Sequence, residues 1–263
     1  MLELKNEACT TRTLADEILR IALDIGGAIL KSGGEINRVE DTVSRICRAY
    51  GAEHVEIFAI PSILIAAIRL KNGEYSSQVR RIDNVSNNLY RLEEYNSISR
   101  RICRNTPEIE EVDKMIADVK KKTPYPSWLC LIGAILAAGS FAVFFGGDIF
   151  DGLVAGFIAI PIYFIDSLPF RRVNRLAKTV MQSFIGGMFA LLAVILGIGS
   201  NEGMIMIGTI MILIPGLSFG TAFRDLLCGD FLAGTLKTVQ CFLIALMIAA
   251  GYLLSMFLLG GYV

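Results

Sequence analysis

The sequence predicts an α-helical integral membrane protein, with about five transmembrane helices behind an N-terminal cytoplasmic domain of the α+β class. The main observation is where the charges lie: 19 of the 25 Lys and Arg, and 19 of the 25 Asp and Glu, lie at or before Lys122. The rest of the chain is dominated by apolar stretches long enough to cross a bilayer as helices. A stretch with Pro124 and Pro126 separates the two halves, so we expect a cytoplasmic domain at residues 1–126 and a membrane domain at 127–263.

The cytoplasmic domain begins with two predicted helices. Apolar residues recur at helical spacing over residues 14–32, and Gly33-Gly34 is a typical helix end. A second helix follows at once, because Asn37 and Glu40 have the spacing of a capping box and an apolar face runs on to Gly51.

A small antiparallel sheet is predicted next. Residues 55–59 alternate between apolar and polar side chains, and residues 63–70 form a β-rich run. Asn72-Gly73 favours a tight hairpin turn into a third strand at residues 75–82. Two more helical segments, at about 84–103 and 108–122, lead to the membrane domain.

Five stretches of the second half are predicted to span the membrane, because each is a mostly apolar run of about the length that a spanning helix needs. They are residues 128–146, 149–165, 179–198, 204–223 and 238–259. Small residues along them, such as Gly139 and the Gly186-Gly187 pair, are expected to let the helices pack closely.

The placement of Lys and Arg predicts the orientation, because these residues stay on the cytoplasmic side. If Lys120, Lys121 and Lys122 are cytoplasmic, five crossings leave every later basic residue on the same side: Arg171, Arg172, Arg175, Lys178, Arg224 and Lys237. The N-terminus is then cytoplasmic and the C-terminus extracytoplasmic.

Several classes of function are disfavoured by composition. Both halves are nearly neutral, whereas a nucleic-acid surface needs a basic excess. The six Cys are scattered and His54 is the single His, so local spacing yields no metal site. Lys31-Ser32 precedes Gly33-Gly34 and does not follow a Walker glycine, so no nucleotide and no other cofactor is expected. Residues 1–11 lack the apolar stretch of a signal peptide.

The fourth span carries the candidate substrate site. Pro215 removes a backbone donor and Gly216 is a poor helix former, so this helix is predicted to be kinked or broken. A half-helix starting near Gly216 would point free N–H groups inward, with the Ser218 and Thr221 hydroxyls close by, as a cradle for a substrate carboxylate. The alternative is a packing kink healed by neighbouring helices, and the sequence leaves both readings open.

Charged residues near the cytoplasmic side are candidates for gating or coupling. Arg224 and Asp225 follow the broken helix and are interpreted as a helix anchor or as a gating pair. Asp230 lies near the same side, where a carboxylate can take part in proton coupling. Arg38 and Glu40 are expected opposite the apolar face of the second helix. They are interpreted as a solvated face, as an intersubunit salt-bridge set or as part of a gate under the pore.

Two separated motifs resemble the signature segments of the bacterial threonine/serine exporter family (ThrE-like, YjjP branch). The first motif is residues 32–41, SGGEINRVED, followed by Tyr50-Gly51. The second is Leu213-Ile214-Pro215-Gly216, followed by Arg224-Asp225 and Gly229-Asp230. The resemblance covers nearly the whole chain in order.

The resemblance implies an exporter subunit in the bacterial plasma membrane, driven by an ion gradient and acting on small carboxylate-bearing metabolites. Threonine and serine, or dicarboxylates such as succinate, are the implied substrates. A separate small membrane protein of the same family is the implied partner, and a homo-oligomer is a further open alternative. From the residues alone, a membrane-anchored cytoplasmic sensor or enzyme is the competing reading, although residues 1–126 show no nucleophile paired with a base.

Overall fold

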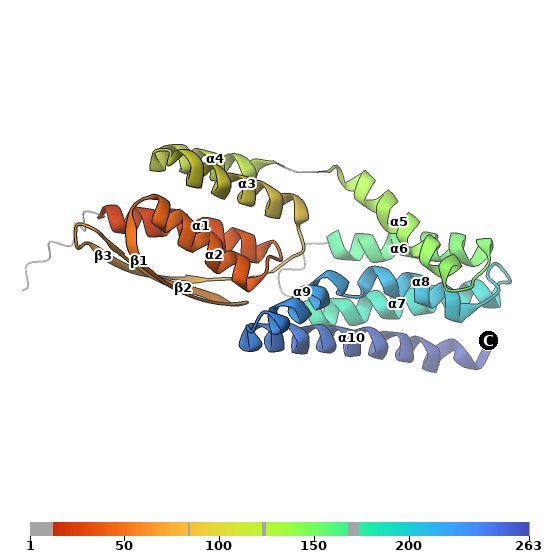
Figure 1. Cartoon of the computed structure of the whole chain (residues 1–263). Helices are drawn as coiled ribbons and strands as arrows, with labels where there is room; N and C mark the ends of the chain where they lie inside the picture. The colour runs from red at the N-terminus through yellow and green to blue at the C-terminus, as the bar shows by residue number, and fades with distance from the viewer. Residues whose placement is uncertain (1–12, 84, 123–124, 168–173, 263) are drawn as a thin grey trace, which may run out of the picture. The chain divides into compact units, whose positions relative to one another are not determined.

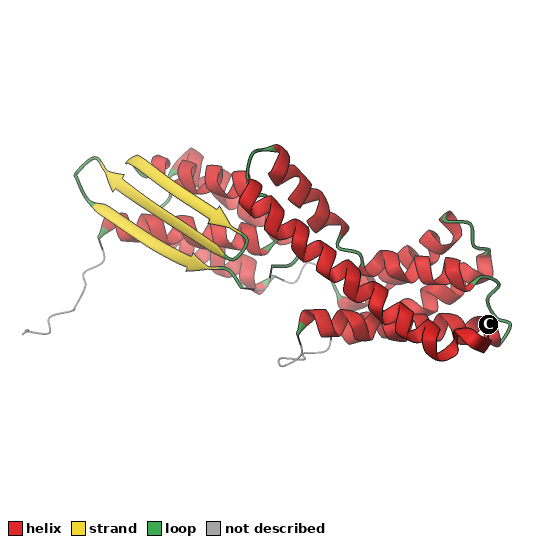
Figure 2. Cartoon of the chain, turned by 90° about the horizontal axis from the view of Figure 1, so that it is seen from below, coloured by secondary structure: helices red, strands yellow, loops and turns green. Residues whose placement is uncertain are grey.

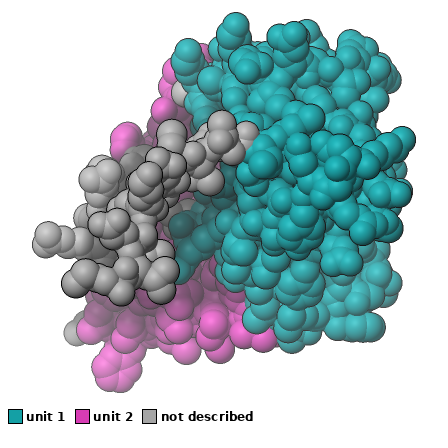
Figure 3. Space-filling model, turned by 90° about the vertical axis from the view of Figure 1, so that its left-hand side faces the viewer, with its two compact units in different colours: residues 1–122, 217–238 teal, residues 123–216, 239–263 magenta. Residues whose placement is uncertain are grey.

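The computed structural model describes residues 13–83, 85–122, 125–167 and 174–262. Sequence predictions that fall on Asn84, Pro124, Arg171, Arg172 and residues 1–12 therefore lie outside the described residues. The chain divides into two compact units, coloured differently in Figure 3: a first unit of residues 1–122 and 217–238, and a second unit of residues 123–216 and 239–263. Residues 217–238 thus pack with the N-terminal part, while the assignment of residues 1–126 to the cytoplasm stays a prediction.

The first unit is built around the helix α1 (Leu14–Lys31) and the helix α2 (Ile36–Ala49). Thr13 caps α1 in a capping box with Asp16, and Gly33 takes a left-handed φ of 91° just beyond the helix end. The predicted stop at Gly33-Gly34 is confirmed. The predicted cap of α2 is wrong: Glu35 is the N-cap, and it makes no side-chain hydrogen bond to the helix.

Three strands form one small antiparallel sheet, as predicted, and their order is β1-β2-β3. They are β1 (Ala52–Ile60), β2 (Ile63–Leu70) and β3 (Tyr75–Arg81). Gly73 adopts φ 90° in the turn between β2 and β3, a conformation that favours glycine. Alternation along β2 buries Leu64, Ala66 and Ile68 on one face, which is what a sheet with one covered face requires.

The first unit has three layers, which Figure 1 shows edge-on: the sheet, then α1 and α2, then α3 (Leu89–Asn105) and α4 (Ile109–Lys121). In Figure 2 the sheet lies in front of the helices. Helix α1 lies in the middle layer and buries most of its circumference, including Ile18, Leu19 and Ile25, while a stripe with Arg20 and Asp24 is partly exposed. Helix α3 begins five residues later than predicted, because the Asn88 side chain caps it by accepting the Arg91 N–H at 2.9 Å.

The second half of the chain is helical, and its long helices match the predicted spans within a few residues at most ends. They are α5 (Ser127–Phe144), α6 (Ile149–Ser167), α7 (Arg175–Ile195), α8 (Glu202–Leu213), α9 (Gly216–Leu227) and α10 (Phe231–Leu259), followed by a short 3-10 turn at Gly260–Tyr262. Among the described residues, α5, α6, α7 and α10 are each long and apolar enough to cross a membrane, and α8 with α9 makes a fifth span if the bent pair is one crossing.

The fourth predicted span is broken where the sequence predicts it. Helix α8 ends at Leu213, Ile214 is extended, and α9 starts at Gly216, with a bend of 58° between the two helices. The α8 and α9 segments have 12 residues each, so neither alone reaches the roughly 20 residues of a full span.

Glycines set the close helix contacts of the second unit. A Cβ on Gly139 of α5 would lie 2.8 Å from the carbonyl oxygen of Gly152 on α6. Gly251 of α10 faces α7 in the same way, since a Cβ there would lie 2.6 Å from the Val180 carbonyl oxygen. The predicted packing role of small residues holds at these positions, where two backbones approach with no room for a side chain.

Asp151 orders the loop between α7 and α8. Its side chain is buried and accepts the backbone N–H groups of Ser200 at 2.7 Å and Asn201 at 3.1 Å. The neighbouring Asp148 accepts the Asp151 N–H at 2.7 Å and the Ser200 hydroxyl at 2.8 Å, and these two hydrogen bonds lower the pKa of Asp148. This carboxylate pair therefore ties the α7–α8 loop to the start of α6.

Candidate functional site

A buried ion pair in the first unit joins α9 to α10. The Lys237 Nζ lies 2.6 Å from the Asp225 Oδ2, and both residues are nearly inaccessible to solvent. They approach because α9 and α10 are consecutive helices joined by a tight turn at Gly229, which has a φ of 96°. Two buried opposite charges satisfy each other here, and either one alone would be costly in this position.

The same pair holds the start of α2. The second carboxylate oxygen of Asp225 accepts the Ile36 N–H at 3.2 Å, and the Lys237 Nζ donates to the Gly34 carbonyl oxygen at 3.4 Å. Ile36 is the first residue of α2, where backbone N–H groups have no partner within the helix and favour a negative charge. Asp225 thus acts as an anionic cap contributed from a segment 189 residues away.

Two exposed contacts surround this buried centre. Arg224 Nη1 lies 2.8 Å from the Glu35 Oε1, and the Asn87 side-chain amide donates to the Ser218 hydroxyl at 3.1 Å. Residues 34–36 of the first sequence motif and residues 224–225 of the second are therefore in direct contact. Arg224 and Asp225, predicted as a helix anchor or a gating pair, do not pair with each other: each binds a partner of opposite charge elsewhere in the chain.

Two further carboxyls lie near the pair. Glu40 accepts the Ala59 N–H at 2.9 Å, and burial, together with the charge of Asp230, raises its pKa. Burial raises the pKa of Asp230 as well, and the charge of Asp225 adds to this effect. The Asp230 Oδ2 is buried without a hydrogen-bond partner among the described residues. A carboxyl in that position accepts a proton more readily than an exposed one.

The predicted substrate residues follow one another along the start of α9. Pro215 lies in the break, Gly216 begins the helix, and the Thr221 hydroxyl donates to the Ser218 carbonyl oxygen at 3.0 Å. Arg38, which was grouped with Glu40 from the sequence, is exposed on α2. The structure thus places Glu40, Asp225 and Asp230 in one neighbourhood and leaves Arg38 on the surface.

Sequence reasoning missed Lys237 as a site residue. The predicted fifth span begins at residue 238, but α10 begins at Phe231, so Lys237 lies in its second turn. A Lys inside an otherwise apolar helix is itself a signal of a functional or paired charge. Its partner, Asp225, could not be assigned from spacing alone.

A buried polar seam in the second unit was also missed. The Thr209 hydroxyl of α8 lies 2.7 Å from the Tyr252 hydroxyl of α10, and the Gln182 amide of α7 donates to the Ile162 carbonyl oxygen at 3.1 Å. Their side chains are nearly inaccessible. Hydrogen bonds of this kind join helices where no water competes. The sequence signal that could have indicated them was the presence of single polar residues in otherwise apolar helices.

No group of three or more His, Cys, Asp or Glu side chains suited to a metal ion occurs among the described residues. The charges of Asp225 and Lys237 contact one another and the backbone groups of Ile36 and Gly34. Such an arrangement can hold two segments together while the pair is intact, and it exposes a Lys and an Asp when the pair separates.

Comparison with known proteins fixes the family. The profile of the family described as "Putative threonine/serine exporter" matches residues 20–259. The chain belongs to this family. Two curated relatives named "Probable succinate transporter subunit YjjP" are similar over almost their whole length: the protein of Klebsiella aerogenes is 24% identical over 92% of this chain and 94% of its own. The protein of Escherichia coli K12 is 23% identical over 92% of this chain and 95% of its own. No solved structure matches.

Membership of this exporter family confirms the resemblance that the two motifs suggested, and with the apolar helices it makes the chain a membrane transport protein. Both curated relatives carry the word subunit in their names. The family favours transport over the reading of the chain as a membrane-anchored enzyme or sensor. The two motifs that carry the resemblance are the segments that meet at the Asp225–Lys237 pair.

Proposed function

We propose that this chain is an exporter subunit for small carboxylate-bearing metabolites, either threonine and serine or dicarboxylates such as succinate, driven by an ion gradient. The observation that carries this proposal is the buried Asp225–Lys237 pair. Asp225 lies on α9 of the bent α8–α9 pair, and the ion pair contacts Gly34 and Ile36. The family description, which names threonine and serine, supports the first substrate class, and the names of the two relatives, which mention succinate, support the second.

The pair is proposed to be the gate on the cytoplasmic side. In the closed state of the gate, the Lys237 ammonium binds the Asp225 carboxylate, and Asp225 caps α2. A substrate carboxylate has the same charge and the same oxygen acceptors as Asp225, so it can replace Asp225 on Lys237. The Asp225–Ile36 contact is then released. The exchange selects for carboxylates, because a neutral solute offers Lys237 no replacement charge.

The break at Pro215 and Gly216 is proposed as the second part of the substrate route. The first turn of a helix has N–H groups without a partner in that helix, and it carries the positive end of the helix dipole. Ser218 and Thr221 add hydroxyls within the first two turns of α9. The proposed route then passes from the Lys237 ammonium to the positive end of the α9 dipole.

Asp230 and Glu40 are proposed to take part in proton coupling. Each has a pKa raised by burial, and each carries a negative charge that repels the other. A proton on Asp230 removes its repulsion of Asp225, which leaves the Asp225–Lys237 pair stronger and the gate closed. Loss of that proton weakens the pair, so proton movement is linked to opening.

The proposed orientation puts the N-terminus in the cytoplasm and the C-terminus outside the bacterial plasma membrane. Packing of residues 217–238 with the N-terminal residues supports this, because it keeps Arg224 and Lys237 with the domain that carries most of the charge. The proposed partner is a separate small membrane protein of the same family, as the subunit names of the relatives suggest.

The substrate class is tested by efflux from bacterial cells that lack related exporters. Cells are loaded with labelled succinate, or with threonine-containing and serine-containing dipeptides that release the amino acids inside. Efflux is compared with this chain alone, the proposed small membrane partner of the same family alone, and both together. Faster efflux of one solute with both proteins identifies the substrate, and unchanged efflux of all three solutes contradicts the exporter proposal.

A further inference from the structure

A basic cavity lies at the surface of the first unit, away from the Asp225–Lys237 pair, and Lys31, Arg91 and Lys120 in its lining are exposed. It has a volume of about 220 Å³ and is bounded by α1, β3, α3 and α4. Its charged and hydroxyl lining consists of Asp24, Lys31, Arg80, Arg91, Tyr95 and Lys120, together with the buried Ser32. Four cationic side chains face one carboxylate, so the lining has a marked positive excess.

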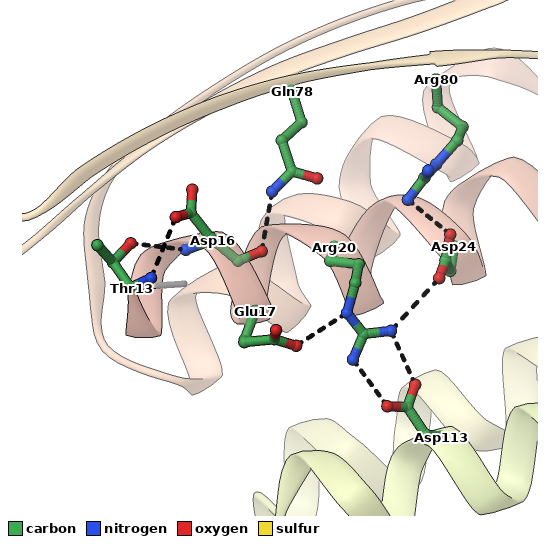
Figure 4. A network of polar contacts seen from close by, with 8 residues as sticks. All are labelled: Thr13, Asp16, Glu17, Arg20, Asp24, Gln78, Arg80 and Asp113. Carbon is green, nitrogen blue, oxygen red and sulfur yellow. Dashed lines mark hydrogen bonds and ion pairs between the residues drawn. The ribbon is translucent and has the colours of Figure 1, made fainter. Parts of the chain in front are cut away.

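The single carboxylate is already shared. Asp24 lies 2.7 Å from the Arg80 Nη2 and 3.6 Å from the Arg20 Nη1, and Arg20 also binds Asp113 of α4 at 2.7 Å (Figure 4). Asp24 therefore neutralises less than one full charge at the cavity. The charges of Lys31, Arg91 and Lys120 face the same space from three helices.

Arg80 supplies a donor with no acceptor. Its Nε is buried and has no hydrogen-bond partner among the described residues. A buried guanidinium N–H without an acceptor is costly, and an anion in the cavity would supply one. Tyr95 is buried beside it, and burial raises the pKa of its hydroxyl, so it stays a neutral donor at physiological pH.

From the cavity, its charge and the unpartnered Arg80 nitrogen, we propose that the first unit binds a small dianion at this site. Four cations and one carboxylate leave an excess of about three positive charges, which a dianion matches better than a monovalent ion. The volume suits a molecule of a few non-hydrogen atoms and is smaller than the roughly 300–1,000 Å³ of sites for drug-sized ligands. Inorganic phosphate and a short dicarboxylate share this chemistry.

The site is placed to affect the proposed gate. Lys31 and Ser32 line the cavity, and the chain continues from them through Gly34 to Ile36, which contact Lys237 and Asp225. The Lys31 carbonyl oxygen accepts the Ser86 N–H at 2.8 Å, and the Ser32 carbonyl oxygen accepts the Asn88 N–H at 3.1 Å. A dianion on Lys31 would therefore order the segment that the gate holds. The binding proposal itself does not depend on the exporter proposal.

The test is titration calorimetry on the purified full-length chain in detergent, with sodium phosphate and sodium succinate as separate probes. Sodium chloride at equal ionic strength is the blank. We expect saturable binding of at least one dianion, and Arg80→Gln and Lys31→Gln should each weaken it about tenfold or more. Arg81→Gln is the matched control, because Arg81 is the next residue of β3 and its side chain is 86% exposed.

The outcomes separate the site from other sources of binding. Absence of saturable heat with both probes overturns the proposal, as does equal binding by wild type, Arg80→Gln and Lys31→Gln. An equal loss in Arg81→Gln indicates nonspecific surface charge and also overturns it. Succinate binding that is lost in Lys237→Gln but kept in Arg80→Gln belongs to the transport route. Competition between the two probes identifies whether phosphate or the dicarboxylate is the preferred ligand.

Discussion

The Lys237 ammonium and the Asp225 carboxylate are 2.6 Å apart in a buried contact that also holds Gly34 and Ile36. Removing one charge of a buried pair leaves the other without compensation, at a cost of about 3–5 kcal/mol. We therefore expect Asp225→Asn to lower the thermal unfolding midpoint of the purified chain strongly. The double variant Asp225→Asn with Lys237→Met should recover most of the loss.

Arg224→Gln is the control for that experiment. Its partner Glu35 is partly exposed and Arg224 is 65% exposed, and surface pairs of this kind contribute about 0–1 kcal/mol. A midpoint in Arg224→Gln as low as that of Asp225→Asn would argue against a special role for the buried pair.

Asp151 offers a test in the second unit. Asp151→Ala leaves the N–H groups of Ser200 and Asn201 without their acceptor, and a buried unsatisfied donor costs about 1–3 kcal/mol. We expect a lower thermal midpoint and faster proteolysis in the α7–α8 loop. Asp148→Ala, at an exposed position in the same turn, should have a smaller effect. Equal effects of the two variants would contradict the assignment of Asp151 as the loop anchor.

Close packing of α7 and α10 predicts a steric effect at Gly251. The atoms that a Cβ would meet there include the Val180 carbonyl oxygen and the Phe184 nitrogen, which are backbone atoms and cannot rotate away. Gly251→Val should destabilise the chain by about 1–3 kcal/mol. Gly133→Val is the control, since no atom lies within 4 Å of a Cβ at Gly133. A tolerated Gly251→Val would mean that the two helices do not approach this closely.

The raised pKa of Glu40 predicts a pH-dependent stability. A carboxyl whose pKa is higher in the folded state stabilises the fold below its ordinary value of 4.5, and this contribution is lost as the pH rises through the folded value. Glu40→Gln should therefore raise the unfolding midpoint relative to wild type at pH 7.5, and the gain should disappear near pH 4. Glu56→Gln, at an exposed site on β1, should show no such trend. A gain that grows on acidification would reverse the assigned sign.

Local signals in the sequence predicted most of the elements. Gly33 ends α1, Asn72-Gly73 turns the chain between β2 and β3, and Pro215-Gly216 interrupts the fourth span, because glycine and proline impose backbone conformations whatever surrounds them. The cap of α2 was misassigned for the opposite reason. Asn37 and Glu40 have the right spacing, but Glu40 binds the Ala59 N–H of β1 and the cap comes from Asp225.

The candidate site could be predicted only in part. Asp225 and Asp230 stand out as acids close to apolar helices, whereas Lys237 was placed outside its span because the apolar run starts after it. The pairing of Asp225 with Ile36 joins positions 189 residues apart, and no periodicity in one sequence reports such a contact. The cavity around Arg80 could not be predicted for the same reason, since its four cations come from four separate elements.

The gate is tested most directly by efflux of the identified carboxylate from proteoliposomes that contain this chain, together with its small membrane partner if the cell assay requires it. The variants are Lys237→Gln and Lys237→Arg, with Arg224→Gln as the control and gel filtration to check that each variant is folded. Our account predicts at least a tenfold loss of efflux in Lys237→Gln, partial activity in Lys237→Arg, and near wild-type efflux in Arg224→Gln. Wild-type efflux by folded Lys237→Gln would contradict the account.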